Sequence, residues 1–395
     1  MDVFRNRQAL SLLLLLLVGT VSNSMIVPFM PYYIVEGLGA EPWRISLYTG
    51  AAVLLTVTFN RLTGRWLDEG GRFFPLIAAS SVAYMAACLT VYLFPAFWVL
   101  VTIGALGFAV SGTFMAVVFT FGRQFADRSG LDASRFNAFL RGTTSTAWML
   151  GPAFAFTLVD GIGPHQVFAA AFLIGAIRLV AGLWAVPRTF AGGQDTPAAG
   201  ANAAGGINTA LWQALSACFL LSLAHSLCFV ALPLFYTQEV HLPDFAPGLA
   251  FSVKTAVEIA IIATTPVMMK RFSHRAILLS ASLLALVAIF ALWRVTSLPT
   301  MIVAQALEGA YYGIYASVGV SFVQSFARNR MGRATSLYVN TIMITGVVSG
   351  PAVGLLGQFF SFRTAIGLSS ICVLMAIVAF LMVRTNETSA LKDAA

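Results

Sequence analysis

The chain alternates long apolar stretches with short polar ones. Each apolar stretch is roughly 17 residues or longer, which is the length that an α-helix needs to cross the hydrocarbon core of a bilayer. The pattern predicts helices over twelve ranges: 8–33, 44–60, 74–94, 97–121, 136–158, 164–186, 210–236, 247–269, 276–295, 299–325, 334–358 and 363–384. We therefore expect an all-α polytopic membrane protein with twelve transmembrane helices.

A Gly-Pro pair occurs in the fifth predicted helix and again in the eleventh, about half a chain length later. The first pair is Gly151-Pro152 and the second is Gly350-Pro351. Proline weakens a membrane helix, and glycine lets a neighbouring helix approach closely. Because the pair recurs at corresponding places, we expect two similar halves, each a repeat of six helices.

A stretch rich in Gly and Ala separates the sixth predicted helix from the seventh. It reads TFAGGQDTPAAGANAAGGIN and has little apolar surface to pack, so we expect a flexible linker. The predicted organisation is an N-terminal six-helix bundle over 1–188, a linker over 189–208 and a C-terminal six-helix bundle over 209–395.

Composition and charge agree with insertion into a membrane. The chain is 59% hydrophobic and 10% charged, whereas soluble domains carry roughly 25% charged residues. Of the 23 Lys and Arg residues, Arg141, Arg178 and Lys254 lie deep within predicted helices, and only Arg44, Arg294 and Arg363, at helix ends, lie on the side opposite the N-terminus. Basic loops stay in the cytoplasm, so both termini and the linker are predicted to be cytoplasmic. The net charge of +8 then needs no nucleic-acid partner.

The sequence lacks the motifs of enzymes and of ATP-driven pumps. Its four Cys lie in apolar stretches without CxxC spacing, and its four His are scattered. There is no HExxH, GxSxG or Walker A motif, and no pair of intramembrane Asp residues. We therefore expect no metal, no cofactor and no enzymatic activity. A sensor that does not transport but has the same architecture stays an open alternative.

The segment after the second predicted helix, GRWLDEGGRF, resembles the signature loop of the major facilitator superfamily. The matching residues are Gly64, Asp68, Gly71 and Arg72. We expect Gly64 to let helices approach, and Asp68 to cap a helix N-terminus or to pair with an Arg, as parts of a gate. The corresponding segment after the eighth helix, MMKRFSHR, lacks the Asp and the glycines.

The Gly-Pro helices also resemble the helix-five motif of exporters in that superfamily. The second copy, Gly346-x-x-x-Gly350-Pro351-x-x-Gly354, matches better than the first, where Ala147 replaces the leading Gly. The resemblance assigns both Gly-Pro pairs to the gating machinery. A face of small residues that only packs against another helix explains the same pattern.

Four further stretches resemble the bacterial sugar efflux transporter family of the superfamily. They are GLGAEPWRISLYTG, RQFADRSG with the following LRGTTSTAWMLGP, LPDFAPGLAFSVKTAVEI and LYVNTIMITGVVSG. The resemblance implies a monomeric secondary transporter that exports sugars or sugar analogues across the bacterial inner membrane in exchange for protons. The alternative is a proton-coupled exporter of drugs or other amphipathic compounds. Such antiporters usually carry an Arg in helix four, and the range 97–121 has none.

In this superfamily, helices one, four, seven and ten line the central cavity, with two, five, eight and eleven beside them. A sugar needs polar partners for its hydroxyls and an aromatic ring for its C–H face. Residues of both kinds recur at helical spacing on these helices. The candidate substrate-binding residues are Asn23, Arg141, Trp148, His225, Gln305, Tyr311, Tyr312, Tyr315 and Asn340.

Proton exchange requires a group that gains and loses a proton within the membrane. Only Glu258 and Glu308 are acids inside the predicted helices, and Lys254 lies one helical turn from Glu258. Glu258 lies in the stretch that resembles the family, whereas Glu308 has no cation at helical spacing on its own helix. Both are therefore candidate proton carriers, and Lys254–Glu258 is alternatively an internal ion pair.

The charge bias yields a prediction about topology. Single cysteines introduced at Gly193, in the linker, and at Ala394, in the C-terminal tail, should resist an impermeant thiol reagent in intact cells. Both should react after permeabilisation. Labelling of either cysteine from outside would overturn the predicted orientation.

Overall fold

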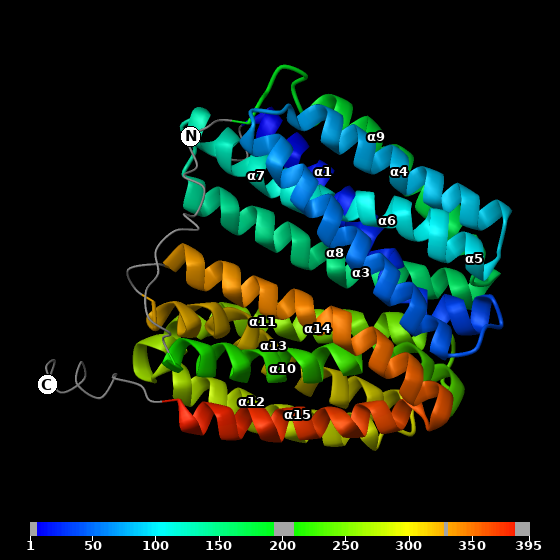
Figure 1. Ribbon diagram of the computed structural model, residues 1–395, viewed down its shortest axis with the longest axis vertical. Coiled ribbons are helices and arrows are strands. Elements are labelled where there is room, and N and C mark those ends of the chain that lie inside the picture. The colour runs from blue at the N-terminus through cyan, green and yellow to red at the C-terminus, as the bar shows by residue number, and fades with distance from the viewer. Residues whose placement is uncertain (1–5, 193–208, 328–330, 384–395) are drawn as a thin grey trace, which may run out of the picture. The chain divides into compact units, whose positions relative to one another are not determined.

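The computed structural model describes residues 6–192, 209–327 and 331–383, which form helices joined by short turns (Figure 1). Within these ranges there is no β-strand and only an isolated bridge between Arg72 and Ala191. The predicted all-α class is therefore confirmed. The elements up to the linker are α1 (Arg7–Ile26), α2 (Phe29–Tyr32), the π-helical η2 (Tyr33–Gly37), α3 (Trp43–Asp68), α4 (Phe73–Leu93), α5 (Phe97–Val99), the π-helical η3 (Leu100–Gly104), α6 (Ala105–Gly112), α7 (Phe114–Arg128), α8 (Ala133–Ile162) and α9 (Gln166–Ala185).

The elements after the linker continue the same pattern of long helices. They are α10 (Thr209–Leu234), the π-helical η4 (Phe235–Glu239), α11 (Ala246–Arg271), α12 (His274–Trp293), α13 (Leu298–Ser325), α14 (Met331–Phe359) and α15 (Phe362–Met382). The chain divides into two compact units. The first unit comprises Met1–Pro197 with Pro243–Ser252, and the second comprises Ala198–Leu242 with Val253–Ala395.

Several helices extend beyond the apolar stretches that predicted them. The second predicted helix, 44–60, continues as α3 to Asp68, and the fourth, 97–121, continues through α7 to Arg128. Hydropathy marks the part of a helix that lies in hydrocarbon. Backbone hydrogen bonding continues beyond it, because polar side chains at a helix end do not interrupt the i→i−4 pattern.

Ten of the described helical segments are long and apolar enough to cross a membrane. Among the long helices of the described chain, α8 and α13 fall outside these ten. They are the helices that carry Arg141 and the pair Gln305 and Glu308. Polar residues, including these candidate site residues, lower the hydropathy of both helices.

A proline precedes a π-helical segment in both units. Pro31 lies two residues before η2, and Pro233 lies two residues before η4. Proline cannot donate a backbone hydrogen bond, and a π-helical turn is a common local adjustment next to such an interruption. The helix that opens each unit therefore carries the same irregularity.

Helix pairing within the first unit has a counterpart within the second. In the first unit, α1 packs against α8 and α9, and α4 packs against α6 and α9. In the second unit, α10 packs against α14 and α15, and α12 packs against α13 and α15. In each unit, therefore, the first long helix packs against the last two long helices of that unit.

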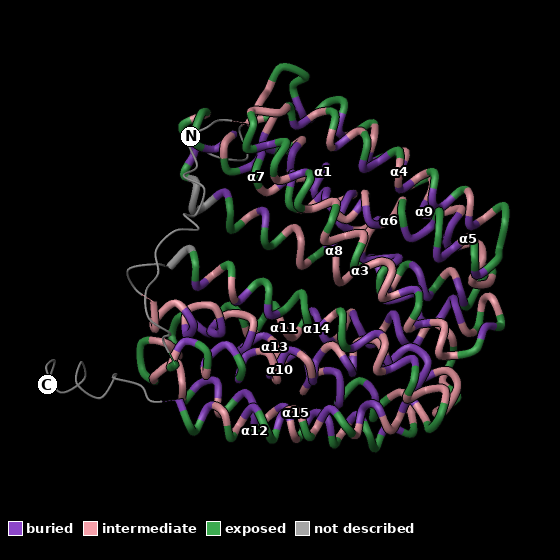
Figure 2. The backbone as a smooth tube through the Cα atoms, in the orientation of Figure 1, coloured by how far each residue is buried: buried purple, intermediate pink, exposed green. Residues whose placement is uncertain are grey.

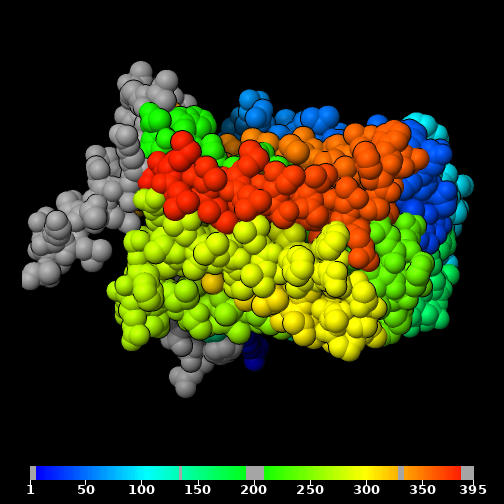
Figure 3. Space-filling model, turned by 90° about the horizontal axis from the view of Figure 1, so that it is seen from below, coloured from blue at the N-terminus to red at the C-terminus, as the bar shows by residue number. Residues whose placement is uncertain are grey.

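Burial alternates along the helices of each unit, with buried positions turned toward neighbouring helices (Figure 2). Large apolar side chains stay exposed on the other faces. On α15, which crosses the face drawn in Figure 3, they include Ile371, Leu374, Met375, Val378 and Leu381. Water disfavours so much apolar surface, so this surface fits contact with lipid.

The first residues of the predicted linker are attached to the first unit. The Gly192 N–H donates to the carbonyl oxygen of Gly71 at 2.9 Å, and the Phe73 N–H donates to that of Phe190 at 3.3 Å. The Arg128 guanidinium lies 4.2 Å from the Phe190 ring centroid. Only 189–192 of the predicted linker is described, and 193–208 lies outside the described residues.

Helices α1 and α8 are in direct contact at Gly151. The Ser24 hydroxyl donates to the Ala147 carbonyl oxygen at 2.9 Å. A Cβ atom on Gly151 would lie 2.9 Å from the Met25 nitrogen and 3.0 Å from the Val21 oxygen, which is too close. A small residue is therefore required here, as expected for a packing face.

This contact predicts unequal effects of two alanine substitutions on α8. Gly151→Ala should lower the melting temperature of the purified protein by several degrees, because overpacking typically costs about 1–3 kcal/mol. Gly142→Ala is the matched control on the same helix, since a Cβ atom there would meet no atom within 4 Å. Equal melting temperatures for the two variants would contradict the contact.

Candidate functional site

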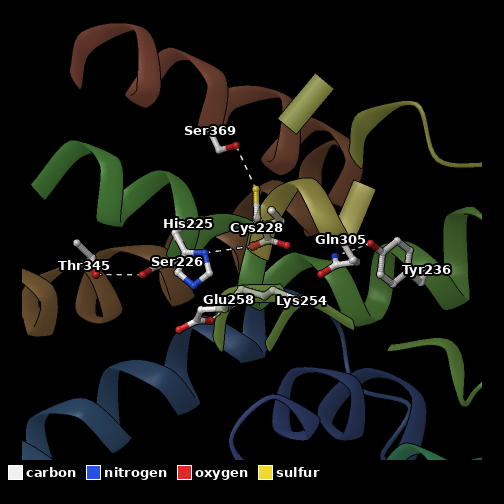
Figure 4. Close-up of polar contacts among 10 residues, drawn as sticks. His225, Ser226, Cys228, Tyr236, Lys254, Glu258, Gln305, Thr345 and Ser369 are labelled. Atoms are coloured by element: carbon white, nitrogen blue, oxygen red, sulfur yellow. Dashed lines mark hydrogen bonds and ion pairs between the residues drawn. The ribbon is translucent and has the colours of Figure 1, made fainter. Parts of the chain in front are cut away.

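Polar side chains from α10, α11 and α13 meet inside the second unit (Figure 4). The Nδ1 atom of His225, on α10, lies 3.1 Å from the Oε1 atom of Glu308, on α13. The His225 ring stacks on the Tyr312 ring with the centroids 3.8 Å apart. Glu308 and Tyr312 are one helical turn apart, so one histidine contacts both the acid and the ring.

Lys254 and Glu258 complete this cluster from α11. The Lys254 ammonium lies 3.5 Å from the Oε2 atom of Glu258 and 4.4 Å from the Tyr312 ring centroid. The contact with the ring is a cation–π interaction. We call His225, Lys254, Glu258, Glu308 and Tyr312 the charged cluster. It brings together five residues that the sequence assigned separately to substrate binding and to proton coupling.

Two glycines on α13 allow α11 to come this close. A Cβ atom on Gly309 would lie 3.2 Å from the Cα atom of Lys254, and one on Gly313 would lie 2.9 Å from the carbonyl oxygen of Glu258. Sequence reasoning missed these glycines. Their signal was the spacing of four residues, which is the small-xxx-small pattern of close helix pairs.

The side chains of the charged cluster differ in solvent exposure. The side chain of Glu258 is 17% exposed, that of His225 is 10% exposed and that of Glu308 is 1% exposed. Within the described chain, neither oxygen of Glu308 forms a hydrogen bond of normal geometry, although His225 lies at ion-pair distance from one of them. A buried carboxylate with so few partners is costly when ionised.

Three other candidate residues on α13 are enclosed by protein. Gln305 donates from Nε2 to the Tyr236 hydroxyl at 2.8 Å. The Tyr315 hydroxyl donates to the Cys218 carbonyl oxygen at 3.0 Å and lies 2.6 Å from the Ser222 hydroxyl. Both residues, and Tyr311, are at most 1% exposed. In this conformation they offer little surface to a ligand, whereas Tyr312 is partly exposed.

The candidates of the first unit lie on α1 and α8. Asn23 is partly exposed on α1, and its Oδ1 atom accepts a hydrogen bond from the Ser111 hydroxyl at 3.0 Å. Arg141 is exposed on α8, and Trp148 on the same helix is partly buried. The last candidate, Asn340, belongs to the second unit and is exposed on α14.

Arg178, on α9, is a buried charge to which sequence reasoning gave no role. It is 0% exposed, and it donates hydrogen bonds to the hydroxyls of Ser22, Ser80 and Ser111 at 3.4, 2.8 and 3.0 Å. The sequence did indicate that Arg178 is unusual, because an Arg within an apolar stretch needs partners inside the protein. The three serines lie on α1, α4 and α6, so their convergence could not be inferred from spacing.

The segment that resembles the signature loop differs from expectation. Gly64 and Asp68 lie in the last turns of α3 rather than in a loop. A Cβ atom on Gly64 would meet no atom within 4 Å, so the close approach of helices expected at Gly64 stays a prediction. Asp68 and Arg72 are exposed, and within the described residues Asp68 caps no helix and pairs with no Arg.

The two Gly-Pro pairs lie inside helices. Pro152 is within α8 and Pro351 is within α14. Gly151 and Gly350 are both buried. Their role in a gate stays a prediction. Across the described residues, no group of three or more His, Cys, Asp or Glu side chains is arranged to hold a metal ion.

Comparison with known proteins gives a consistent picture. Residues 214–395 match the family model described as Major Facilitator Superfamily. The chain is 25% identical over 351 residues to Sugar efflux transporter B of Salmonella typhimurium, covering 87% of each chain. It is 22% identical over 376 residues to Sugar efflux transporter C of Escherichia coli, covering 93% of this chain and 95% of that one.

Solved structures share the fold at low sequence identity. The crystal structure of the nucleoside transporter NupG matches with a TM-score of 0.79 and 12% identity, covering 96% of this chain and 99% of that chain. A bacterial homologue of the lysosomal transporter Spinster matches with a TM-score of 0.73 and 11% identity, covering 97% of each chain. Residues 214–395 thus match the Major Facilitator Superfamily model, and over most of its length the chain is similar to sugar efflux transporters.

Proposed function

We propose that the protein is a secondary active transporter that exports sugars or sugar analogues in exchange for protons by alternating access. The observation that carries the proposal is the charged cluster. It offers a partly exposed ring, Tyr312, beside an ammonium and a carboxylate, with a buried acid directly behind. The names of the relatives support sugar as the substrate, because the matches cover most of the chain.

The proposed architecture has twelve spans in two six-helix repeats, 1–188 and 209–395, joined by the linker 189–208. The equivalent helix pairing in the two units and the shared Pro31 and Pro233 irregularities support it. We place both termini in the cytoplasm on the ground of the Lys and Arg distribution. We place the protein in the bacterial inner membrane as a monomer on the ground of its similarity to sugar efflux transporters.

For sugar binding, the exposed part of the Tyr312 ring, which His225 and Lys254 leave uncovered, would contact the C–H face of a pyranose. Lys254 and Glu258 would then hydrogen-bond to hydroxyls at the ring edge, with a donor on one side and an acceptor on the other. Arg141, an exposed guanidinium on a membrane helix, would bind further hydroxyls through its fork of donors. Asn23 would contribute an amide.

For proton coupling, Glu308 or Glu258 would carry the proton. Glu308 is enclosed and contacts His225, so a proton would reach it through the imidazole. Exchange requires that protonation and sugar binding oppose each other, and both involve the same few residues. One proton per cycle is worth about 1.4 kcal/mol per pH unit, which supports roughly a tenfold sugar gradient per unit.

Proton movement in proteoliposomes tests this function. Addition of a sugar from a panel of mono- and disaccharides should alter the internal pH, and a panel of cationic drugs should not. Movement with the drugs alone would make the protein an exporter of amphipathic compounds.

Glutamine variants in the same vesicles identify the coupling acid. Neutralising it through Glu258→Gln or Glu308→Gln should abolish pH-driven export while sugar–sugar exchange continues, because exchange needs no net proton transfer. Glu36→Gln changes an exposed acid at the end of η2 and should retain both activities. If both intramembrane variants keep full pH-driven export, coupling through these acids is wrong and facilitated diffusion replaces it.

Arg141 yields a separate prediction. Arg141→Ala should raise the apparent KM for sugar by about tenfold or more, since hydrogen bonds to a charged group are worth roughly 1.5–3 kcal/mol. Arg141→Lys keeps the charge but loses the planar fork and should also be impaired. Arg61→Ala, at an exposed Arg of α3, is the control. An unchanged KM for Arg141→Ala, at equal protein level, would remove Arg141 from the site.

A further inference from the structure

We propose that Arg178 is a positioning residue for the sugar site, acting through Ser111 to hold the side-chain amide of Asn23 with its nitrogen free to donate. The inference rests on the proposed function, and it assigns a role to a buried charge outside the charged cluster. All the residues involved belong to the first unit.

The environment of Arg178 is unusual for a charge in a membrane helix. No carboxylate lies within 4.0 Å of it among the described residues. Its partners are three serine hydroxyls and the rings of Phe114 and Tyr84, whose centroids lie 4.0 and 5.7 Å from the guanidinium carbon. Its Nε atom is buried and has no hydrogen-bond partner in the described chain. A charge compensated only by neutral groups is costly to bury, so its retention calls for a role beyond packing.

The three serine hydroxyls donate their hydrogens to different kinds of acceptor. The Ser22 hydroxyl donates to the Gly19 carbonyl oxygen at 2.8 Å, and the Ser80 hydroxyl donates to that of Ile77 at 2.9 Å. These two serines therefore accept from Arg178 and return their hydrogen to their own helix. The Ser111 hydroxyl instead donates to another side chain, the Oδ1 atom of Asn23, at 3.0 Å.

The direction of this relay follows from the chemistry of the groups. A guanidinium can only donate, so Ser111 must accept from Arg178 and its own hydrogen is left for Asn23. The positive charge of Arg178 favours the orientation of the Asn23 amide in which the oxygen, and not the NH₂ group, faces Arg178. A flipped amide would place its NH₂ group toward the cation and is disfavoured.

The consequence for Asn23 is a fixed orientation. Its oxygen is occupied by Ser111, while its nitrogen makes no hydrogen bond within the described residues and its side chain is partly exposed. The nitrogen is therefore available to donate to an acceptor oxygen of a ligand. We assign that acceptor to a hydroxyl oxygen of the exported sugar.

The test compares Ser111→Ala with Ser80→Ala, using glucose, galactose and lactose as probes in proteoliposomes. Ser111→Ala breaks the relay but leaves Arg178 its bonds to Ser22 and Ser80. It should raise the apparent KM by about tenfold with little change in maximal rate, as expected for one lost hydrogen bond. Ser80→Ala removes one support of Arg178 without breaking the relay and should change KM less than about twofold. Ser111→Thr keeps the hydroxyl and should restore the wild-type KM.

A double-mutant cycle separates positioning from a general structural effect. If Ser111 acts only through Asn23, adding Ser111→Ala to Asn23→Ala should change KM no further. Effects that multiply, or equal effects of Ser111→Ala and Ser80→Ala, would overturn the proposal. If Ser111→Ala does not accumulate in the membrane, Ser111→Cys is used in the same cycle.

A measurement made without sugar tests the positioning role of Arg178 separately from the proposed transport function. In protein labelled with ¹⁵N-asparagine, the Asn23 side-chain signal is identified by its loss in Asn23→Gln. That signal should shift in Ser111→Ala and stay unchanged in Ser80→Ala. If no sugar is transported by the wild-type protein, the proposed function fails. An Asn23 signal insensitive to Ser111→Ala would by itself overturn the positioning role.

Discussion

Lipid tails offer no hydrogen bonds, so a polar side chain inside a bilayer is stabilised only by groups that the protein itself supplies. The two units meet this requirement in different ways. The second unit gathers ionisable groups around one aromatic ring, with His225 against Glu308 and the opposite charges of Lys254 and Glu258 paired. The first unit surrounds a single guanidinium, Arg178, with hydroxyls. Charge pairs can change with protonation or ligand, whereas a guanidinium bound by serines keeps its state.

The charged cluster and the contact between α1 and α8 both depend on how closely helices approach. Gly309 and Gly313 bring the backbone of α11 against α13, which places Lys254 and Glu258 next to Tyr312. Gly151 brings α8 against α1 one turn from the Ser24–Ala147 hydrogen bond. Small residues are thus the condition for the polar contacts, because a larger side chain would separate the backbones that carry them.

Sequence patterns predicted the helices well and the contacts between them poorly. Apolar stretches predicted the long helices of the described chain, although polar residues leave α8 and α13 outside the ten segments that are apolar enough to cross a membrane. The rule that intramembrane charges are functional singled out Glu258, Glu308 and Lys254. It could not pair Glu308 with His225, since that contact joins α10 to α13 and depends on how the helices pack.

Other features left a weak signal or a misleading one. The four-residue spacing of Gly309 and Gly313 was visible but went unused, and the serines around Arg178 resemble ordinary small residues of a packing face. The segment around Gly64 matched a family signature, yet α3 continues through it to Asp68. A match to a family motif indicates common ancestry. It does not show how a matching residue such as Gly64 packs, which only the structure reveals.

The order of residues around Arg178 bears on how the protein is made. Ser22, Ser80 and Ser111 all precede Arg178 in the chain, so a ribosome completes α1, α4 and α6 before α9 emerges. Placing an Arg at the centre of a helix opposes insertion by about 2.5–3.5 kcal/mol when the helix enters the bilayer alone. Here the hydroxyls that bind the guanidinium are already synthesised when α9 leaves the ribosome. Helix α9 can therefore enter the membrane against α1, α4 and α6, and the charge of Arg178 need never face lipid by itself.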